Sequence, residues 1–205
     1  MSNWDGLTPM QIDALKEIGN IGIGNATTAL ATMVQRKINM EVPRAEVRHF
    51  EDIFYLVGSA EEVVSCVNLA VHGDAPGRIL FLLGHSSSLC LIDLLMGNPA
   101  GTTKIIGEME TSALQEVGNI LAGSFLNSFS QVTGLSMYPS VPAFAHDMLG
   151  AILSSALIEA GYYAERALFI QTAFHDEGII LNGHFFLLPE TGALDIILNS
   201  LGISE

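Results

Sequence analysis

The chain has 205 residues, of which 49% are hydrophobic and 15% charged, and this composition excludes an intrinsically disordered protein. Its 22 acidic residues outnumber its 8 Lys and Arg residues, which gives a formal net charge of −14. So acidic a chain argues against a nucleic-acid backbone as ligand. It favours a protein partner that presents Lys or Arg, or it simply keeps the protein soluble.

The sequence shows no sign of export or of membrane insertion. Residues 1–6 are polar and lack the basic start and apolar stretch of a signal peptide. Residues 117–145 carry no charged side chain, but their asparagines, serines and prolines are too polar for a span of about 20 apolar residues. Cys66 and Cys90 lie in apolar runs, which favours buried free thiols. We therefore expect a cytoplasmic protein.

The first half of the chain predicts a helix, a strand, a helical turn, a hairpin and a second helix. Thr8 and Gln11 form a capping box, and the helix that follows is expected to reach about Arg36. A strand is predicted at residues 38–50, where Pro43 marks a strand start, an edge or a bulge because it cannot donate to a sheet ladder. The remaining predictions are a helical turn at 51–60, hairpin strands at 62–71 and 78–84, and a helix at 86–96.

The second half repeats this order. We predict a helix at 108–132, a strand at 135–144, a helix at 147–160 capped by Asp147, hairpin strands at 166–174 and 179–188, and a helix at 191–201. An internal repeat of this size implies pseudo-twofold symmetry around one shared core. The fold class is therefore α+β, with a largely antiparallel sheet of about six strands and packed helices, two of them long. We expect one domain over residues 1–205, made of two repeats (about 8–105 and 106–201).

The same motif opens both halves. The first copy reads D-A-L-K-E-I-G-N and the second reads S-A-L-Q-E-V-G-N. In each copy Glu comes four positions after the first residue, Asn comes three positions later, and 22 residues then precede a proline. The motif residues are Asp13, Glu17, Asn20 and Pro43 in the first copy, and Ser112, Glu116, Asn119 and Pro142 in the second.

Helical geometry places the polar motif residues together. Positions i, i+4 and i+7 fall within an arc of roughly 60°, so Asp13, Glu17 and Asn20 project from one face of the first helix. A single E-x-x-N would merely decorate a solvated surface. Here Asn and the preceding Gly are both poor helix formers, yet both halves contain them. This recurrence predicts a functional site, although an ancestral duplication alone would preserve part of the pattern.

Other familiar chemistry is missing from the sequence. There is no G-x-x-x-x-G-K-[ST] nucleotide loop, and the six histidines show no H-x-x-x-H spacing. The G-x-S at Gly84–Ser86 lacks the closing glycine of a nucleophile elbow, because position 88 is Ser88. We therefore predict no metal centre, no cofactor of the protein's own and no covalent nucleophile.

A carboxylate and an amide one helical turn apart make half of an active site. The amide can hold a water by donating and accepting hydrogen bonds, and the carboxylate can pair with a Lys on another molecule. A water held in line with an acyl phosphate would attack it faster. A substrate protein would then supply the phosphoryl-aspartate and its Mg²⁺.

The doubled pattern [D/S]-x-x-x-E-x-x-N-x(22)-P resembles the signature of the CheC/CheX/FliY family of bacterial chemotaxis phosphatases, most of all its CheC branch. The resemblance covers nearly the whole chain and implies hydrolysis of phosphorylated CheY, the response regulator of the flagellar motor. It implies that Asn20 and Asn119 orient the attacking water. Glu17 and Glu116 would dock the regulator through its active-site lysine, and CheY would carry the Mg²⁺.

The resemblance also implies a second partner, the receptor deamidase CheD. The predicted helix beginning at Asp147 is apolar nearly all round, so it is either buried or offers a surface to a partner. Burial is the default. The alternative hypothesis places CheD on an outer face that includes Asp147, Leu149 and Leu153.

Two competing hypotheses remain beside the phosphatase. The first is a non-catalytic adaptor that binds CheY or CheD and controls their availability. The second is a free-standing hydrolase in which Glu17 and Glu116 form an acid–base pair. Because two copies of the motif lie within one chain, we expect a monomer.

Overall fold

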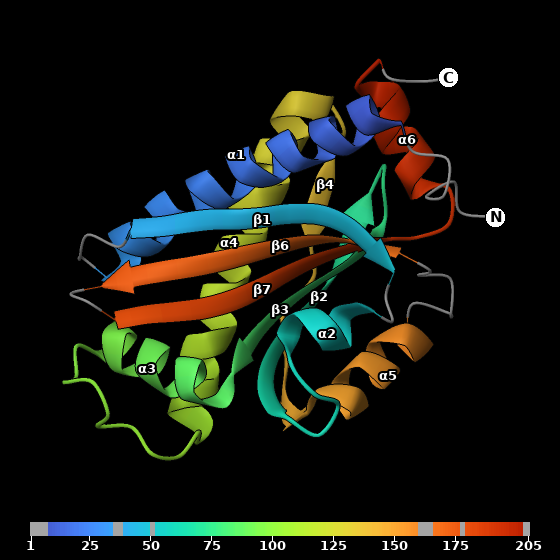
Figure 1. Ribbon diagram of the computed structural model, residues 1–205. Helices are drawn as coiled ribbons and strands as arrows, with labels where there is room; N and C mark the ends of the chain where they lie inside the picture. Colours follow the sequence, from blue (N-terminus) through green and yellow to red (C-terminus); the bar gives the residue numbers. More distant parts are fainter. Residues whose placement is uncertain (1–7, 35–38, 50–51, 160–165, 177–178, 203–205) are drawn as a thin grey trace.

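The computed structural model describes residues 8–34, 39–49, 52–159, 166–176 and 179–202, which form six helices and seven strands (Figure 1). The helices are α1 Pro9–Val34, α2 Ile53–Val57, α3 His85–Met96, α4 Glu108–Thr133, α5 Leu149–Glu159 and α6 Ala193–Ser200. The strands are β1 Asn39–His49, β2 Val63–Gly73, β3 Gly77–Gly84, β4 Met137–Pro139, β5 Ala143–Met148, β6 Arg166–Asp176 and β7 Ile179–Pro189. The predicted α+β class is confirmed.

The strands form one antiparallel sheet in which the two halves of the chain are interleaved. The order is β1-β6-β7-β3-β2-β4, and β5 also pairs with β2. Thus β1 from the first half adds to the hairpin of the second half, and β5 from the second half adds to the hairpin of the first. The β3 and β7 strands pair at the centre. This arrangement has the pseudo-twofold symmetry that the internal repeat predicts.

The two motif prolines interrupt the outer strands. Pro43 lies in edge strand β1, where the pairing with β6 shifts register between Glu41 and Arg44, as expected for a bulge. Pro142 lies between β4 and β5, so the single strand predicted at 135–144 is wrong. At the break, the Ser140 amide donates a hydrogen bond to the Ala70 carbonyl of β2 at 2.8 Å, and the Ser140 hydroxyl accepts one from the Ala70 amide at 3.0 Å.

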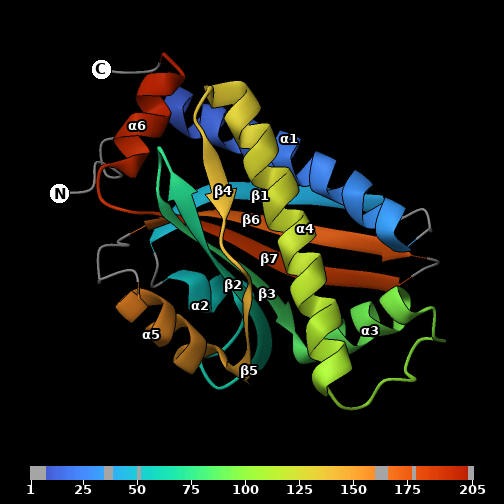
Figure 2. The ribbon, with the colours of Figure 1, turned by 180° about the vertical axis from the view of Figure 1, so that it is seen from behind.

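Helices cover both faces of the sheet. α1, α3, α4 and α6 pack on one face around a large core that includes Leu15 and Phe125. α2 and α5 pack on the other face around a smaller core that includes Ile53 and Leu149 (Figures 1 and 2). Most of β2 is buried on both faces, so its side chains contribute to both cores.

The two long helices cross on the larger face. Gly22 of α1 lies against the ring of Phe125 of α4, where an added Cβ would stand 2.5 Å from a ring carbon. Beside this contact Asn25 donates a hydrogen bond to the Ser128 hydroxyl at 2.8 Å. From the crossing, the N-terminal half of α1 runs toward α6 and that of α4 runs toward α3 (Figure 2). The motif segments, which lie in those halves, therefore diverge.

A buried carboxylate holds the connection that leads into α4. Asp93 of α3 accepts hydrogen bonds from the backbone of Gly101, Thr102 and Thr103 at 2.7–3.0 Å, and from the Thr103 hydroxyl at 2.6 Å. Burial acts to raise the pKa of Asp93, but these hydrogen bonds outweigh it and leave the pKa below its usual value. The ionised Asp93 side chain thus holds residues 101–103 of the connection between α3 and α4.

The helix predicted at residues 147–160 begins two residues later, and its expected cap is wrong. Asp147 belongs to β5, and its carboxylate accepts a hydrogen bond from the amide of Met148 at 2.7 Å. The first amides of α5 instead donate to backbone carbonyls of the loop between α2 and β2: Leu149 to Glu62 at 2.8 Å and Gly150 to Ala60 at 2.9 Å. These carbonyl partners replace the side-chain cap.

The outer face expected for Leu149 and Leu153 is also wrong. Their side chains are 0% and 1% exposed and belong to the smaller core. Burial, the default reading, holds for that side of α5. Residues on its other side, among them Ala151, Ser154 and Ile158, are exposed.

A buried histidine predicts acid sensitivity. His184 of β7 is 8% exposed and stacks on Phe169, and burial lowers its pKa to about 4. The unfolded chain, with a histidine pKa of about 6.5, takes up the proton first as pH falls. The stability that neutral His184 allows is therefore complete above about pH 6.5 and is lost progressively down to about pH 4, by roughly 3 kcal/mol. Urea unfolding of the wild type and of His184→Leu at pH 7 and pH 4.5 tests this. The variant should lose less stability between these pH values, and equal losses would contradict the prediction.

Candidate functional site

The first motif lies on the open side of α1. Asp13, Glu17 and Asn20 are all exposed, while the neighbouring Ile18 and Gly19 are buried against the sheet. This confirms the predicted placement of the three polar residues on one helix face. Asp13 has a local partner, Lys16 Nζ, at 3.9 Å. Such an exposed pair contributes only a few tenths of a kcal/mol, so Glu17 and Asn20 remain the chemically informative residues.

The second motif occupies the matching part of α4. Ser112 and Glu116 are exposed and Asn119 is partly buried. The Ser112 hydroxyl donates a hydrogen bond to the Glu108 carbonyl at 2.9 Å. Asp13 and Ser112 therefore share a position but make different local contacts. Glu and Asn are what the two copies have in common on their exposed faces.

The glycine before each asparagine has a packing role. A Cβ on Gly19 would stand 2.8 Å from Ile170 Cδ1 of β6, and a Cβ on Gly118 would collide with the side chain of Val67 of β2. Both helices can therefore lie close to a β-branched side chain of the sheet only because this position is Gly. The low helix propensity that we interpreted as a sign of function is explained here, for Gly, by helix–sheet packing.

The second motif is tied to its proline. The Gln115 side-chain amide donates a hydrogen bond to the Pro142 carbonyl at 3.0 Å. This bond joins the break between β4 and β5 to α4, directly before Glu116. Sequence reasoning missed Gln115, although its place inside the repeated motif was the available signal.

The two motifs do not form one cleft. Glu17 and Glu116 are both exposed, and they lie in the N-terminal halves of α1 and α4, which diverge from the crossing (Figure 2). An acid–base pair needs both carboxylates on one bound substrate. This arrangement does not support the free-standing hydrolase, and each motif stands as a separate open half site.

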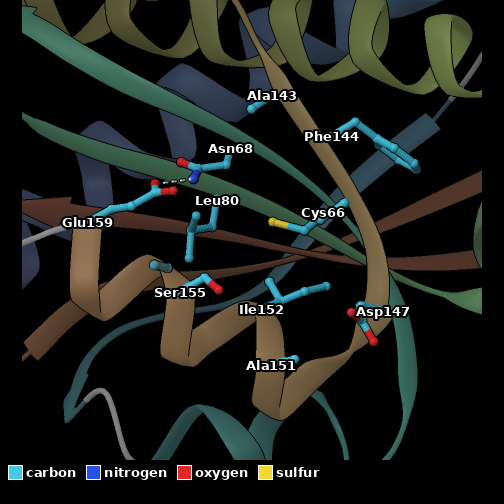
Figure 3. Close-up of a pocket in the computed structure, with 12 residues that line it drawn as sticks. Cys66, Asn68, Leu80, Ala143, Phe144, Asp147, Ala151, Ile152, Ser155 and Glu159 are labelled. Carbon is cyan, nitrogen blue, oxygen red and sulfur yellow. Dashed lines mark hydrogen bonds between the residues drawn. The ribbon is translucent and has the colours of Figure 1, made fainter.

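A cavity of about 240 Å³ lies between β2, β5 and α5 (Figure 3). Its polar rim includes Glu159, which accepts hydrogen bonds from Asn68 at 3.0 Å and from Arg78 at 2.7 Å. Asp147 also lines the cavity, while Cys66 stands at its wall. Burial raises the pKa of the Cys66 thiol to about 12, so it stays protonated and unreactive.

Across the described parts, no group of three or more His, Cys, Asp and Glu side chains is placed to hold a metal ion. None of the helices in the same parts is both long and apolar enough to cross a membrane.

Comparison with known proteins adds a family. The model of the CheC-like family matches residues 10–47 and 109–146, which are the two motif helices with the strands that follow them. CheY-P phosphatase CheC of Bacillus subtilis (strain 168) is 37% identical over 208 residues, covering 100% of both chains. Flagellar motor switch phosphatase FliY of the same organism is 30% identical over 132 residues, which are 62% of this chain and 33% of FliY.

A solved structure shows the same fold. The crystal structure of Thermotoga maritima FliY superimposes with a TM-score of 0.79 and 20% sequence identity. The match covers 97% of this chain and 99% of the FliY chain in that structure. The interleaved sheet with two crossing helices is therefore an architecture shared with a solved protein.

Proposed function

This chain belongs to the CheC-like family and is a phosphatase, and from this premise we propose that it hydrolyses the phosphoryl-aspartate of a CheY-type response regulator. The observation that carries the proposal is the Glu–Asn pair on the open side of a helix, present once on α1 and once on α4, with both glutamates exposed. Each pair is open to a protein surface, and neither is enclosed in a pocket of its own among the described cavities.

The chemistry follows from what each side chain offers. Glu17 and Asn20 lie three residues apart on a helix, so their Cβ atoms are about 5–6 Å apart, and the same holds for Glu116 and Asn119. The amide donates to and accepts from one water, which fixes the orientation of that water. The carboxylate pairs with a lysine of the regulator and sets the angle of approach. The regulator supplies the phosphoryl-aspartate and the Mg²⁺ bound beside it.

Small residues keep the approach to each pair open. Gly24 and Gly123 each stand four residues after the motif asparagine, and a Cβ added at either would meet nothing within 4 Å. The helix surface beyond Asn20 and Asn119 is therefore low and unobstructed. A partner helix or loop can come close enough for the amide to reach a water at the phosphorus.

The direct test is phosphate release from phosphorylated CheY with Mg²⁺ present, with and without this chain. Acceleration at substoichiometric concentration supports the proposal, because a pure binding protein would protect the phosphoryl group or leave its lifetime unchanged. If phosphorylated CheY binds but its dephosphorylation is not accelerated, the adaptor hypothesis replaces the enzyme.

The second proposed partner is CheD, on the exposed side of α5. Ala151 and Ser155 line the cavity beneath this helix and are exposed, so these small residues offer a hollowed surface to a partner (Figure 3). Leu149 and Leu153 contribute by holding the helix against the sheet rather than by contact.

The CheD surface can be tested with two matched variants on one helix. Ala151→Glu places a charge at the cavity and should weaken CheD binding at least tenfold, because the new carboxylate must be desolvated in the interface. Ser154→Glu adds the same charge at an exposed position that does not line the cavity, and should change binding less than twofold. Titration calorimetry with CheD, together with melting temperatures, decides the matter. If both variants bind CheD with equal affinity, the proposal that CheD docks on this side of α5 is wrong.

A further inference from the structure

Two histidines that are far apart in the sequence meet at the end of the sheet. His85 is the first residue of α3, and His146 lies in β5, the strand that pairs with β2. Their ring centroids are 5.2 Å apart, with the ring planes inclined at 41°. Both residues are exposed. The pair therefore presents two imidazoles to solvent from different halves of the chain.

The separation of the rings suits a shared metal ion. With Zn–N bonds of about 2.0 Å and a tetrahedral angle at the metal, the centroids of two coordinating imidazoles stand roughly 5 Å apart. The observed 5.2 Å matches this spacing. Because both rings are exposed, each can turn its free nitrogen toward an ion, and water can occupy the remaining coordination positions.

A buried hydroxyl prepares one of the two ligands. His146 Nδ1 lies 3.0 Å from the hydroxyl oxygen of Ser65, which is 2% exposed. If Nδ1 carries the proton and donates to Ser65, Nε2 keeps its lone pair for a metal. Histidines that bind metals usually donate their second ring N–H to an oxygen in this way. Ser65 is thus a positioning residue for His146.

We propose that His85 and His146, with Ser65 behind His146, form a binding site for a divalent transition-metal ion of the Ni²⁺, Cu²⁺ and Zn²⁺ class. Imidazole nitrogen is a preferred ligand of these ions, whereas Mg²⁺ and Ca²⁺ prefer oxygen. The site has two protein ligands, so it is weaker than a closed structural zinc site. It joins the start of α3, in the first half of the chain, to β5 in the second.

The internal repeat does not provide a second copy of His146. The two segments matched by the family model end at Val47 and His146, so Val47 holds the place in β1 that His146 holds in β5. Ser65 lies two residues before Val67, the strand residue in contact with Gly118 beside Asn119. The histidine pair is therefore linked, through β2, to the strand that packs under the second motif helix.

The test is titration calorimetry of the untagged full chain with NiCl₂ and with ZnCl₂. Wild type should bind one ion, and His85→Ala and His146→Ala should each reduce the affinity at least tenfold. His72→Ala is the matched control, because His72 is an exposed histidine of β2 whose ring contacts Tyr138 instead; its affinity should stay within twofold of wild type. Ser65→Ala should bind 10–100-fold more weakly while both histidines remain.

A second measurement separates loss of ligands from loss of fold. Ni²⁺ should raise the melting temperature of the wild type and of His72→Ala but not that of His146→Ala. MgCl₂ in place of NiCl₂ should give no shift that depends on His146. The proposal is overturned if wild type binds no Ni²⁺ or Zn²⁺ at millimolar concentration, or if the alanine variants at His85 and His146 bind as tightly as wild type.

Discussion

Replacing both Asn20 and Asn119 with alanine is expected to return the dephosphorylation of CheY to its spontaneous rate. Asn20 is exposed and Asn119 is partly buried, and neither belongs to the hydrophobic core. Losing one preorganised hydrogen-bonding group at a reacting centre lowers the rate roughly 10²–10³-fold in well-studied hydrolases. The same loss at both sites should remove nearly all acceleration. Phosphate release from phosphorylated CheY measures it directly.

The single variants apportion the activity between the helices. If the sites act independently, the rates left in Asn20→Ala and Asn119→Ala should sum to the wild-type rate. Asn127→Ala is the matched control, because Asn127 is another exposed asparagine of α4 outside the motif. It should keep full activity. A double variant that is folded and still accelerates release like the wild type would falsify the assignment of the two amides.

Gly118→Ala is expected to destabilise the protein by about 1–3 kcal/mol, the usual range for overpacking a filled site. The added Cβ would collide with Val67, whose branched side chain has little freedom to turn away, and Gly118 itself is buried. The gain in helix propensity, about 1 kcal/mol, offsets only part of this. For a chain of this size the melting temperature should fall by about 2–4 °C per kcal/mol. Because Asn119 is the next residue, activity of the second site should fall as well.

Alanine substitutions at Gly123 and Gly19 provide a comparison for the stability of Gly118→Ala. Gly123→Ala lies on the same helix with open space around the new Cβ, so it should raise stability by up to about 1 kcal/mol. Gly19→Ala meets the mobile end of Ile170 and should be milder than Gly118→Ala. Thermal or urea unfolding of the three variants would reveal the order. Equal effects at Gly118 and Gly123 would show that packing against Val67 is unimportant.

Local signals in the sequence were sufficient for the long helices. The capping box at the start of α1 is present. The Thr8 backbone amide donates to the Gln11 side-chain oxygen at 2.8 Å, and the Gln11 backbone amide donates to the Thr8 hydroxyl at 3.3 Å. The 3.6-residue period placed Glu17 and Asn20 outward and Ile18 inward, and the structure agrees. Such predictions succeed because caps and helix faces depend on residues only a few positions apart.

Features that depend on distant segments were not predictable in this way. Asp147 has the right chemistry for a helix cap, but carbonyls of the loop before β2 bind the first amides of α5 instead. The burial of Leu149 depends on the far side of the sheet, and the meeting of His85 with His146 depends on strand order. The motif glycines show the same limit, since the sheet residues next to Gly19 and Gly118, Ile170 and Val67, each come from the opposite repeat.

The interleaving of the strands has a consequence for how the protein is made. The β1 strand leaves the ribosome early, but its partner β6 is synthesised more than a hundred residues later. At about 5–20 residues per second, β1 waits on the order of ten seconds with an unpaired edge. The first repeat cannot be completed until the last quarter of the chain has emerged. Folding is thus mostly deferred to the end of translation, and a chaperone that shields exposed strand edges would act on this chain during that interval.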